Sequence, residues 1–438
     1  MNLEEESFKF TVGDHKELAE ALCQVMGRDV VHAETKTWRY HSKTGLWKVV
    51  GLADQSCILQ RFSGYQKEEG KVKIKAPDVK GAIQLANDKL TDADFFYGAN
   101  SIAFSDGVIA ATDSGIEFKI KDKIHRVRAG YTFQYGSRRP ESFLKFLESV
   151  FRDDKDYETK IQFVQEFFGA CILGIATRYQ RACIAEGEGE NGKSVLASVM
   201  MQCMPKGTTC AVAPQEWGNE YRRALFVGKH LNAVSELPER DIISSEAFKA
   251  IVTGDQIIGR PIRQAPVEFH PKAGHFFAAN NLPNTPDQSE GFWRRFVVLP
   301  FNRSFKDDPE RDSNIVPKLV AEKQGIVAWL LQGADRLIKR GQYELPPSHF
   351  EAQRVWRLAS DPIQMFLIEC MRPLGLNEPS SFGTTAAQLF TKYRFWCERN
   401  GFRSGSSTAL GKRLKSLGYI SVHRNYGAVY PFVAITFS

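Results

Sequence analysis

The chain has 438 residues, a formal net charge of +7, 43% hydrophobic residues and 25% charged residues. These values are typical of a soluble globular protein of two to four domains. No run of about 18 apolar residues is present, and the acidic start, residues 1–6, lacks an apolar stretch, so we expect neither a membrane span nor a secretory signal. The eight cysteines form no C-x-x-C pair, which argues against a metal cluster and favours reduced thiols in a cytoplasm.

The first expected domain, residues 1–138, has a mixed α+β pattern. Aromatic segments 38–40 and 45–49 predict one hairpin, and residues 102–104 and 107–110 predict another. Residues 82–90 read as a helix. A run of cations follows the second hairpin: Lys119, Lys121, Lys123, Arg126 and Arg128. Its spacing is typical of a solvated edge strand, and a DNA-facing surface is the second interpretation.

The second expected domain, residues 139–345, alternates strand and helix patterns, as an α/β sheet covered by helices does. Residues 141–151 and 158–173 predict amphipathic helices, and the apolar segment 182–185 predicts a buried strand. The next eight residues fit G-x-x-x-x-G-K-[ST], the loop that binds nucleotide phosphates: Gly187, Glu188, Gly189, Glu190, Asn191, Gly192, Lys193 and Ser194. Because a helix pattern follows directly, backbone N–H groups would face the phosphates. Lys193 is expected to reach the β- and γ-phosphates, and Ser194 to bind Mg²⁺.

Polar residues also end later apolar strands of this domain. Glu236 follows one strand and could hold Mg²⁺ or polarise the attacking water, whereas the alternative is a carboxylate at the start of a helix. Asn280 follows the next strand and could bind the γ-phosphate or that water, although its surroundings also suit a turn. Arg294 and Arg295 precede a further strand. They can pair with a buried carboxylate, or one can act as an arginine finger on a nucleotide held by a neighbouring subunit.

The third expected region, residues 346–438, begins with a linker at Leu345-Pro346-Pro347. Helices at 386–399 and 407–416, followed by strands at 419–422 and 429–437, have the order of a winged helix, whose second helix enters the major groove of DNA. Between residues 392 and 424, eight Lys or Arg residues stand against one Glu, an excess equal to the net charge of the whole chain. This clustering favours a nucleic-acid partner over a merely solvated cationic face. The candidate contacts on the second helix are Lys412, Arg413 and Lys415.

In this order the motifs resemble the superfamily 3 helicases, and more narrowly the primase-helicases of phages, plasmids and poxviruses. The resemblance is strong over about residues 140–340 and implies an AAA+-like P-loop ATPase core between an N-terminal α+β domain and a C-terminal winged-helix domain. It assigns Lys193 and Ser194 to Walker A, Glu236 to the Walker B acid and Asn280 to the sensor asparagine. Arg295 is the best match to the arginine finger, with Arg294 second. The remaining matches are Lys249, Gly254-Asp255 and the stretch Arg260 to Gln264.

That last stretch falls where the family carries a pore hairpin that grips DNA, with Arg260 and Arg263 flanking the tip. A local ion pair is an equal alternative for Arg260. Many relatives have two adjacent acids in Walker B, whereas here Ser235 precedes Glu236, so Glu239 is a weaker second candidate for orienting water. No segment with room for a primase precedes the first region, so a separate primase or polymerase is expected.

The function implied by the resemblance is an ATP- and Mg²⁺-dependent DNA helicase that moves 3′→5′ on single-stranded and forked DNA. It would act as a ring hexamer in replicating a phage, plasmid or satellite element, in the cytoplasm of a bacterial host or of a virus-infected cell. Two alternatives remain open: an ATPase ring that remodels a protein partner, and an origin-binding protein that ATP merely switches. A small-molecule P-loop kinase is a more distant one. A strand-displacement assay separates the helicase from the ATPase that remodels a protein partner.

Overall fold

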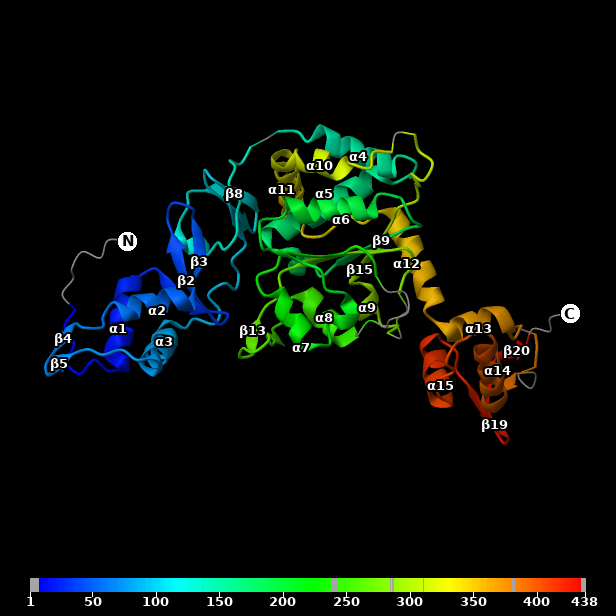
Figure 1. Ribbon diagram of the computed structural model, residues 1–438. Coiled ribbons are helices and arrows are strands. Elements are labelled where there is room, and N and C mark those ends of the chain that lie inside the picture. Colours follow the sequence, from blue (N-terminus) through cyan, green and yellow to red (C-terminus); the bar gives the residue numbers. More distant parts are fainter. Residues whose placement is uncertain are drawn as a thin grey trace.

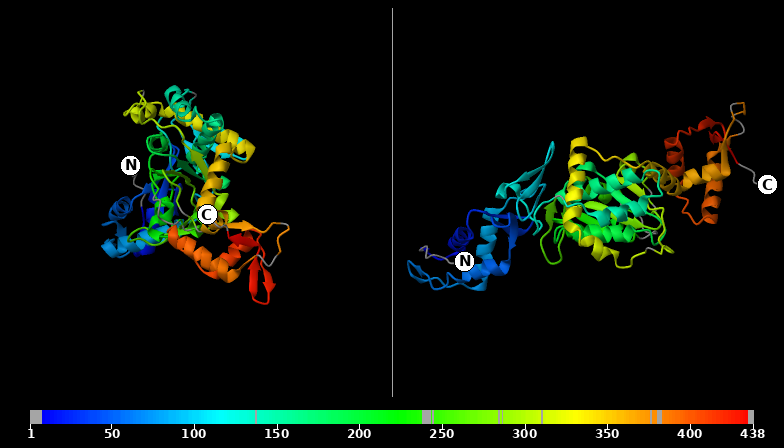
Figure 2. Two further views of the ribbon diagram at one scale, coloured as in Figure 1. Left: turned by 90° about the vertical axis from the view of Figure 1, so that its right-hand side faces the viewer. Right: turned by 90° about the horizontal axis from the view of Figure 1, so that it is seen from above.

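The computed structural model of the chain describes residues 8–136, 138–237, 243, 245–283, 285, 287–309, 311–375, 377–379 and 383–434. The chain forms three masses in a row, running from the blue N-terminal part through the green centre to the red C-terminal part (Figure 1, Figure 2). Among the described helices, none combines the length and the apolar character needed to cross a bilayer.

A five-stranded sheet, parallel throughout, forms the centre of the molecule. Its strands lie in the order β10 (Thr209–Cys210), β11 (Leu231–Val234), β14 (Gly274–Ala279), β9 (Ala182–Glu186) and β15 (Phe296–Pro300). All six residues of β14 are buried, as expected for a strand covered by helices on both faces. Because every strand points the same way, residues that follow the strands meet at one end of the sheet and residues that precede them meet at the other. We call these the carboxyl end and the amino end.

Helices cover both faces of this sheet (Figure 1). One face carries α4 (Glu141–Phe151), α5 (Tyr157–Leu173), α6 (Lys193–Cys203), α10 (Ile315–Val320) and α11 (Lys323–Arg340). The other carries α7 (Glu220–Arg223), α8 (Ser245–Thr253) and α9 (Glu290–Trp293). Each face has its own apolar cluster, with Phe168 and Phe276 on the first and Trp217 and Phe248 on the second. The α/β organisation predicted from the alternating pattern is therefore confirmed.

The linker expected after Leu345 is a helix, α12 (Pro347–Ala359), that packs against β15. The Val298 N–H donates to His349 Nδ1 at 3.1 Å, and the Trp356 ring lies edge-on to Phe296, 5.0 Å between centroids. Pro347 occupies the first turn of α12, where its missing N–H leaves no hydrogen bond unmade. The packed body thus continues past the boundary expected at residue 345.

The N-terminal part contains α1 (His15–Met26), α2 (Leu52–Gln60), α3 (Ala76–Leu90) and three small antiparallel sheets. These are β1 (Val30–Ala33), β2 (Lys36–His41) and β3 (Leu46–Val50); β4 (Gln66–Lys67) and β5 (Gly70–Lys71); and β6 (Ser101–Ala103), β7 (Val108–Thr112) and β8 (Gly115–Lys119). Both predicted hairpins are present, as β2–β3 and β6–β7. The predicted helix 82–90 starts earlier, at Ala76.

The cations expected to form an edge strand are only partly in one. β8 is the edge strand of its sheet, but it ends at Lys119. Beyond it, Lys123 pairs with Asp29 at 2.6 Å and Arg128 pairs with Glu34, so these two side chains are bound within the N-terminal part. The sheet itself packs on the central part, where the Ile116 N–H donates to Asp335 of α11 at 3.0 Å. A domain boundary at residue 138 stays a prediction, and the hydrophobic core extends across it.

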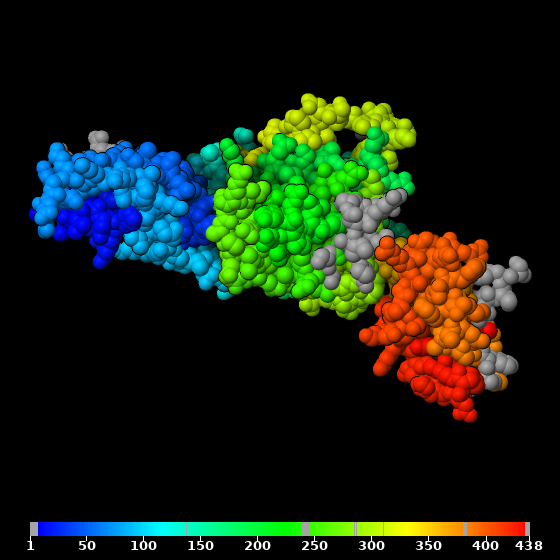
Figure 3. Space-filling model, turned by 60° about the horizontal axis from the view of Figure 1, so that its bottom comes forward, coloured from blue at the N-terminus to red at the C-terminus, as the bar shows by residue number. Residues whose placement is uncertain are grey.

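The C-terminal part follows α12 across a narrow junction (Figure 3). Its elements are α13 (Pro362–Cys370), β16 (Met371–Pro373), β17 (Thr384–Thr385), α14 (Ala386–Arg399), α15 (Ser407–Ser416), β18 (Val422–Arg424), β19 (Gly427–Tyr430) and β20 (Phe432–Ala434). Both helices predicted here have the predicted bounds. The first predicted strand is displaced, because β18 starts at Val422. The second is divided into β19 and β20 with Pro431 between them, and its last residues lie outside the described part of the chain.

Candidate active site

The loop between β9 and α6 has a backbone that two glycines make possible. A Cβ on Gly187 would lie 2.3 Å from Asn191 Nδ2 and 2.5 Å from the Phe301 carbonyl oxygen, closer than atoms can approach. Gly192 has φ +88°, a left-handed conformation that favours glycine. The loop therefore turns tightly enough to present the N-terminus of α6, whose first N–H groups have no partner within the helix.

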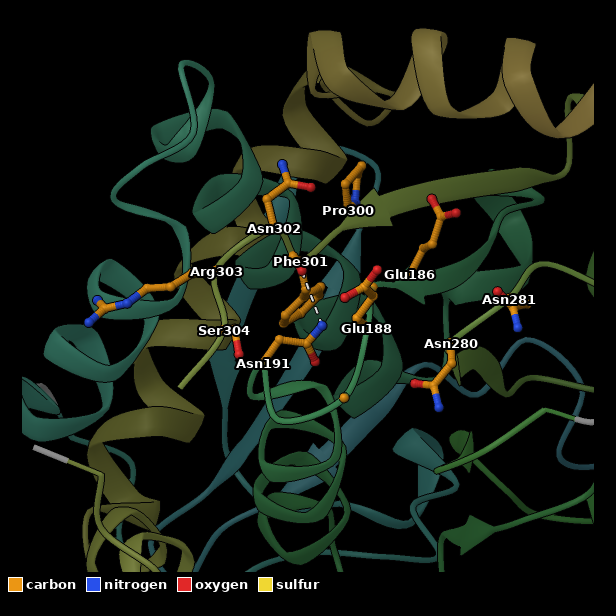
Figure 4. A pocket seen from close by; sticks show the side chains of 12 residues that line it. Glu186, Glu188, Asn191, Asn280, Asn281, Pro300, Phe301, Asn302, Arg303 and Ser304 are labelled. Carbon is orange, nitrogen blue, oxygen red and sulfur yellow. Dashed lines mark hydrogen bonds between the residues drawn. The ribbon is translucent and has the colours of Figure 1, made fainter. Parts of the chain in front are cut away.

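Lys193 is held inside this loop by neutral acceptors. Its side chain is 5% exposed, and Nζ donates to the carbonyls of Gly187 (2.7 Å) and Glu188 (3.1 Å) and to Asn191 Oδ1 (2.8 Å). The Asn191 amide in turn donates to the Phe301 carbonyl at 3.1 Å (Figure 4). Burial lowers the pKa of Lys193, and the nearby Glu186 carboxylate opposes that shift. An anion at this point would offer the ammonium a stronger acceptor than the carbonyls do.

The structure brings Lys193, Ser194, Glu236 and Asn280 to one cavity of about 270 Å³ at the carboxyl end of the sheet. Glu236 follows β11 and Asn280 follows β14, which lies between β11 and β9. The Leu237 N–H donates to the Ala278 carbonyl at 2.9 Å, which keeps the segment after Glu236 beside β14. The four residues that the sequence singles out are thus neighbours in space. Glu239 lies outside the described residues.

A larger cavity of about 510 Å³ adjoins the loop, and sequence reasoning missed most of its wall. Figure 4 shows its side chains, which come from the end of β9, from the loop, from the residues after β14, and from the end of β15 and the segment after it: Glu186, Glu188, Asn191, Asn280, Asn281, Pro300, Phe301, Asn302, Arg303 and Ser304. The signal that could have revealed residues 300–304 is their position after a buried strand, the same position that Glu236 and Asn280 have.

A buried lysine positions this wall. Lys160 is fully buried, pairs with Asp154 at 2.9 Å and donates to the Pro300 carbonyl at 2.8 Å. The other oxygen of Asp154 accepts from the Asn302 amide at 2.6 Å. A buried charge is tolerated only when it is paired and hydrogen-bonded, so this cluster ties the segment after β15 to the start of α5.

Arg294 and Arg295 lie at the amino end of the sheet, away from the loop of their own chain. They precede β15, whose first residue pairs with Ala182 and whose last pairs with Glu186. Five strand residues separate the two ends by about 17 Å. Arg295 donates to the Gly291 carbonyl, and its Nε is buried without a hydrogen-bond partner. Burial lowers the pKa of Arg295, as does the charge of Arg294, which is exposed.

The stretch proposed as a DNA-gripping hairpin is the tip of a two-stranded ribbon, β12 (Ile257–Gly259) and β13 (Val267–Phe269). Arg263 is exposed at the tip with φ +58°. Arg260 lies at the base and makes an ion pair with Glu220, 3.8 Å between Nη1 and Oε1. Of the two interpretations of Arg260, the local ion pair is therefore present, while Arg263 is the side chain that projects.

The three cations predicted on α15 do not share one environment. Lys412 and Lys415 are exposed. Arg413 instead turns toward α13, where its Nη2 and Nε lie 2.6 and 2.9 Å from Asp361 Oδ2. Asp361 is 3% exposed and caps α13, so this pair joins two helices of the C-terminal part. Lys412 and Lys415 remain the candidates on this helix for contact with an anionic partner.

Comparisons with known proteins find a family model and viral relatives that match parts of this chain. A family model described as a family of unknown function (DUF5906) matches residues 185–295, which run from the end of β9 to Arg295. The "Putative helicase L207/L206" of Acanthamoeba polyphaga mimivirus is 23% identical over 283 residues, covering 58% of this chain and 29% of its own length. The "Putative helicase 184R" of Invertebrate iridescent virus 6 is 27% identical over 177 residues, 37% of this chain and 18% of its own.

A third relative, the "Putative helicase 022R" of Frog virus 3, is 26% identical over 238 residues, covering 49% of this chain and 24% of its own length. The chain thus spans less than a third of each of these relatives. Among solved structures, the A form apo structure of the NrS-1 C-terminal region matches with a TM-score of 0.50 at 12% identity, over 96% of this chain and 99% of that one. At this identity the likeness concerns the fold alone.

Proposed function

We propose that this chain is an ATP-driven DNA helicase of the superfamily 3 type, built on an AAA+-like core. The observation that carries the proposal is the cavity where the loop lysine, Ser194, Glu236 and Asn280 meet. A phosphate loop, a strand-end acid and a strand-end amide around one cavity are the groups that phosphoryl transfer to water requires. The printed names of the three viral relatives support the same class of enzyme.

In this proposal Lys193 leaves its three acceptors in the loop and binds the β- and γ-phosphates of ATP. The free N–H groups at the start of α6 bind the same phosphates. The Ser194 hydroxyl and the Glu236 carboxylate would hold Mg²⁺, because oxygen ligands suit this ion and one or two protein ligands suffice when phosphates and waters complete its shell. The ion would neutralise charge on the phosphates. Glu236 and Asn280 then orient the attacking water.

The arginine finger comes from a second copy of the chain. Arg295, or Arg294 in second place, lies about 17 Å from its own loop, so neither guanidinium reaches the γ-phosphate held by the same chain. A neighbouring copy that presents its amino end can supply the charge that stabilises the transition state. Hydrolysis therefore depends on assembly. In a closed ring, which we propose is a hexamer, every copy receives a finger from one neighbour and supplies its own finger to the other.

DNA is bound in two places. Arg263 at the ribbon tip contacts the backbone of one strand in the ring pore, and Lys412 and Lys415 of a winged-helix C-terminal domain contact DNA phosphates. Travel is 3′→5′, on single-stranded or forked DNA, during replication of a phage, plasmid or satellite element. A separate primase or polymerase would act with the chain in the cytoplasm of the host cell. These finer points rest on the resemblance of the motifs.

Strand displacement on a forked DNA, with ATP and Mg²⁺, tests the proposal. The wild-type chain should separate the strands, and Lys193→Ala should not, because it loses its phosphate contact. ATP hydrolysis without any displacement would instead favour an ATPase that remodels a protein partner. Tight binding to one duplex sequence, with negligible displacement, would favour an origin-binding protein switched by ATP.

A further inference from the structure

The two ends of the central sheet carry opposite charge. Three arginines line a cavity of about 460 Å³ at the amino end: Arg178, Arg181 and Arg294. Glu186 and Glu188 line the 510 Å³ cavity at the carboxyl end, where Arg303, a further lining residue, is already paired with Asp308 (Figure 4). Arg181 and Glu186 are attached to the same strand, since one precedes β9 and the other is its last residue. Every copy of the chain therefore presents a basic and an acidic hollow about 17 Å apart.

The amino-end hollow has no counter-charge of its own. No carboxylate lines it, and neither Arg178 nor Arg294 has an ion-pair partner among the described residues. Arg181 is fixed there, because its guanidinium donates to the Arg294 carbonyl. Burial lowers the pKa of Arg181, and the neighbouring charge of Arg294 lowers it further. Like charges gathered without a partner repel one another, so an anionic group would stabilise this hollow.

The carboxyl-end hollow contains carboxylates that no cation of the chain pairs with among the described residues. Glu188 is exposed, Glu186 is partly buried, and neither carboxylate has a hydrogen-bond or ion-pair partner in the described part of the chain. Burial raises the pKa of Glu186, and the nearby Lys193 ammonium opposes that shift. The next acid along the loop differs, since Glu190 pairs with Arg311 at 2.9 Å. A triphosphate bound beside Glu186 and Glu188 would add further negative charge, so cations from outside the chain would stabilise this end.

We propose that the arginine hollow of one copy receives the Glu186 and Glu188 face of a second copy. The partner's charges would then neutralise both hollows at once. Because the two faces lie at opposite ends of one strand, the contact is head-to-tail. Each copy in a pair keeps one of its two faces available for a further copy, and this geometry builds rings or filaments. The inference rests on the proposed function in one respect: it makes the phosphate loop the place where copies meet. We call this contact between two copies the seam. It contains Arg178, Arg181 and Arg294 as well as the finger.

Charge reversal and mixing test this pairing. In Arg181→Glu alone, every seam places a new carboxylate opposite Glu186 and Glu188, and in Glu188→Arg alone every seam places a new guanidinium opposite the three arginines. Each variant should associate about a hundredfold more weakly than wild type, because like charges at an interface cost several kcal/mol. An equimolar mixture can alternate, so that positions 181 and 188 carry opposite charges at every seam, in either the native or the exchanged order, and it should recover assembly. Sedimentation velocity with Mg²⁺ and a slowly hydrolysed ATP analogue measures the mass.

Lys80→Glu is the matched control, because it reverses one exposed cation in the N-terminal part and should assemble like wild type. The melting temperature establishes that each variant is folded. If Arg181→Glu does not fold, Arg178→Glu, in the short 3₁₀ helix Ala176–Tyr179, takes its place in the same mixing design.

The proposal is overturned if the single variants assemble as wild type does, if the mixture stays as dispersed as its components, or if wild type remains monomeric with nucleotide. ATP hydrolysis and strand displacement are measured on the same samples. If the chain unwinds DNA but the charge-reversal variants assemble as wild type does, the pairing is refuted and the proposed function stays intact. A chain that assembles through these charges but neither hydrolyses ATP nor unwinds DNA refutes the proposed function and leaves the pairing intact.

Discussion

The position of Arg295 predicts that two inactive variants restore each other's activity when mixed. Arg295→Ala keeps the phosphate loop but removes the finger, and Lys193→Ala keeps the finger but removes the loop contact. Each homogeneous assembly has no complete site. In related NTPases the loss of a finger costs about 10³ to 10⁵ in rate, so Arg295→Ala should bind ATP normally and turn over almost none.

The expected recovery follows from which end of the sheet each residue occupies. In the proposed assembly a site consists of the loop of one copy and the arginine of the next, since about 17 Å separates the two groups within a chain. In a random equimolar mixture, a seam is complete when an Arg295→Ala copy supplies the loop and a Lys193→Ala copy supplies the finger. Chance pairing makes about one quarter of the seams complete, so the mixture should hydrolyse ATP at about a quarter of the wild-type rate.

Steady-state release of phosphate, at protein concentrations where sedimentation shows full assembly, measures this recovery. A mixture that is assembled yet as inactive as its components would refute the finger in trans, because a finger acting within its own chain cannot be restored by a neighbour. Near-wild-type turnover by Arg295→Ala alone would refute the choice of Arg295. Arg294→Ala, measured in the same way, determines which of the two adjacent arginines is the finger.

Other substitutions test separate parts of the argument. Gly187→Ala should weaken nucleotide binding at least about tenfold by calorimetry, because its Cβ would collide with Asn191 and the Phe301 carbonyl; unchanged affinity would contradict the loop geometry. Arg263→Ala should reduce strand displacement more than basal ATP hydrolysis, whereas an equal loss of both would argue against a pore contact. For pH, burial lowers the pKa of His230 and of His275 to about 3. The unfolded chain therefore binds more protons than the folded one below about pH 6.5, and the free energy of unfolding should fall toward pH 3, by up to about 1.4 kcal/mol per pH unit for each histidine. Denaturant titrations checked against the His275→Asn variant measure this, and a variant with an unchanged pH slope would contradict it.

Local signals predicted the parts of the fold that depend on neighbouring residues in the chain. The phosphate loop is one, because its glycines, lysine and serine are contiguous residues of a single turn. The bounds of α14 and α15 are another. Thr385 and Gln388 form a capping box at the start of α14, and Ser406 caps α15. Residues next to each helix therefore determine where it starts.

Local signals failed where a distant segment decides the outcome. Two consecutive prolines after Leu345 suggested a linker. Proline also suits the start of a helix, and α12 packs its apolar side against β15. The cationic run after Lys119 resembled a strand, yet Asp29 and Glu34 bind two of its side chains elsewhere. Arg413 looked like its exposed neighbours, but Asp361 lies within reach only after α13 and α15 pack together.

The amino-acid sequence alone determined the phosphate-loop motif and which residues compose it, because that loop is built from contiguous residues. It also marked Glu236, Asn280 and the paired arginines as candidates, since each ends or begins an apolar strand. Only the tertiary structure decided which of them meet. Parallel pairing of five strands gathers the residues that follow them at one end and places Arg294 and Arg295 at the other, so the direction of the strands separates the loop of each chain from its own paired arginines.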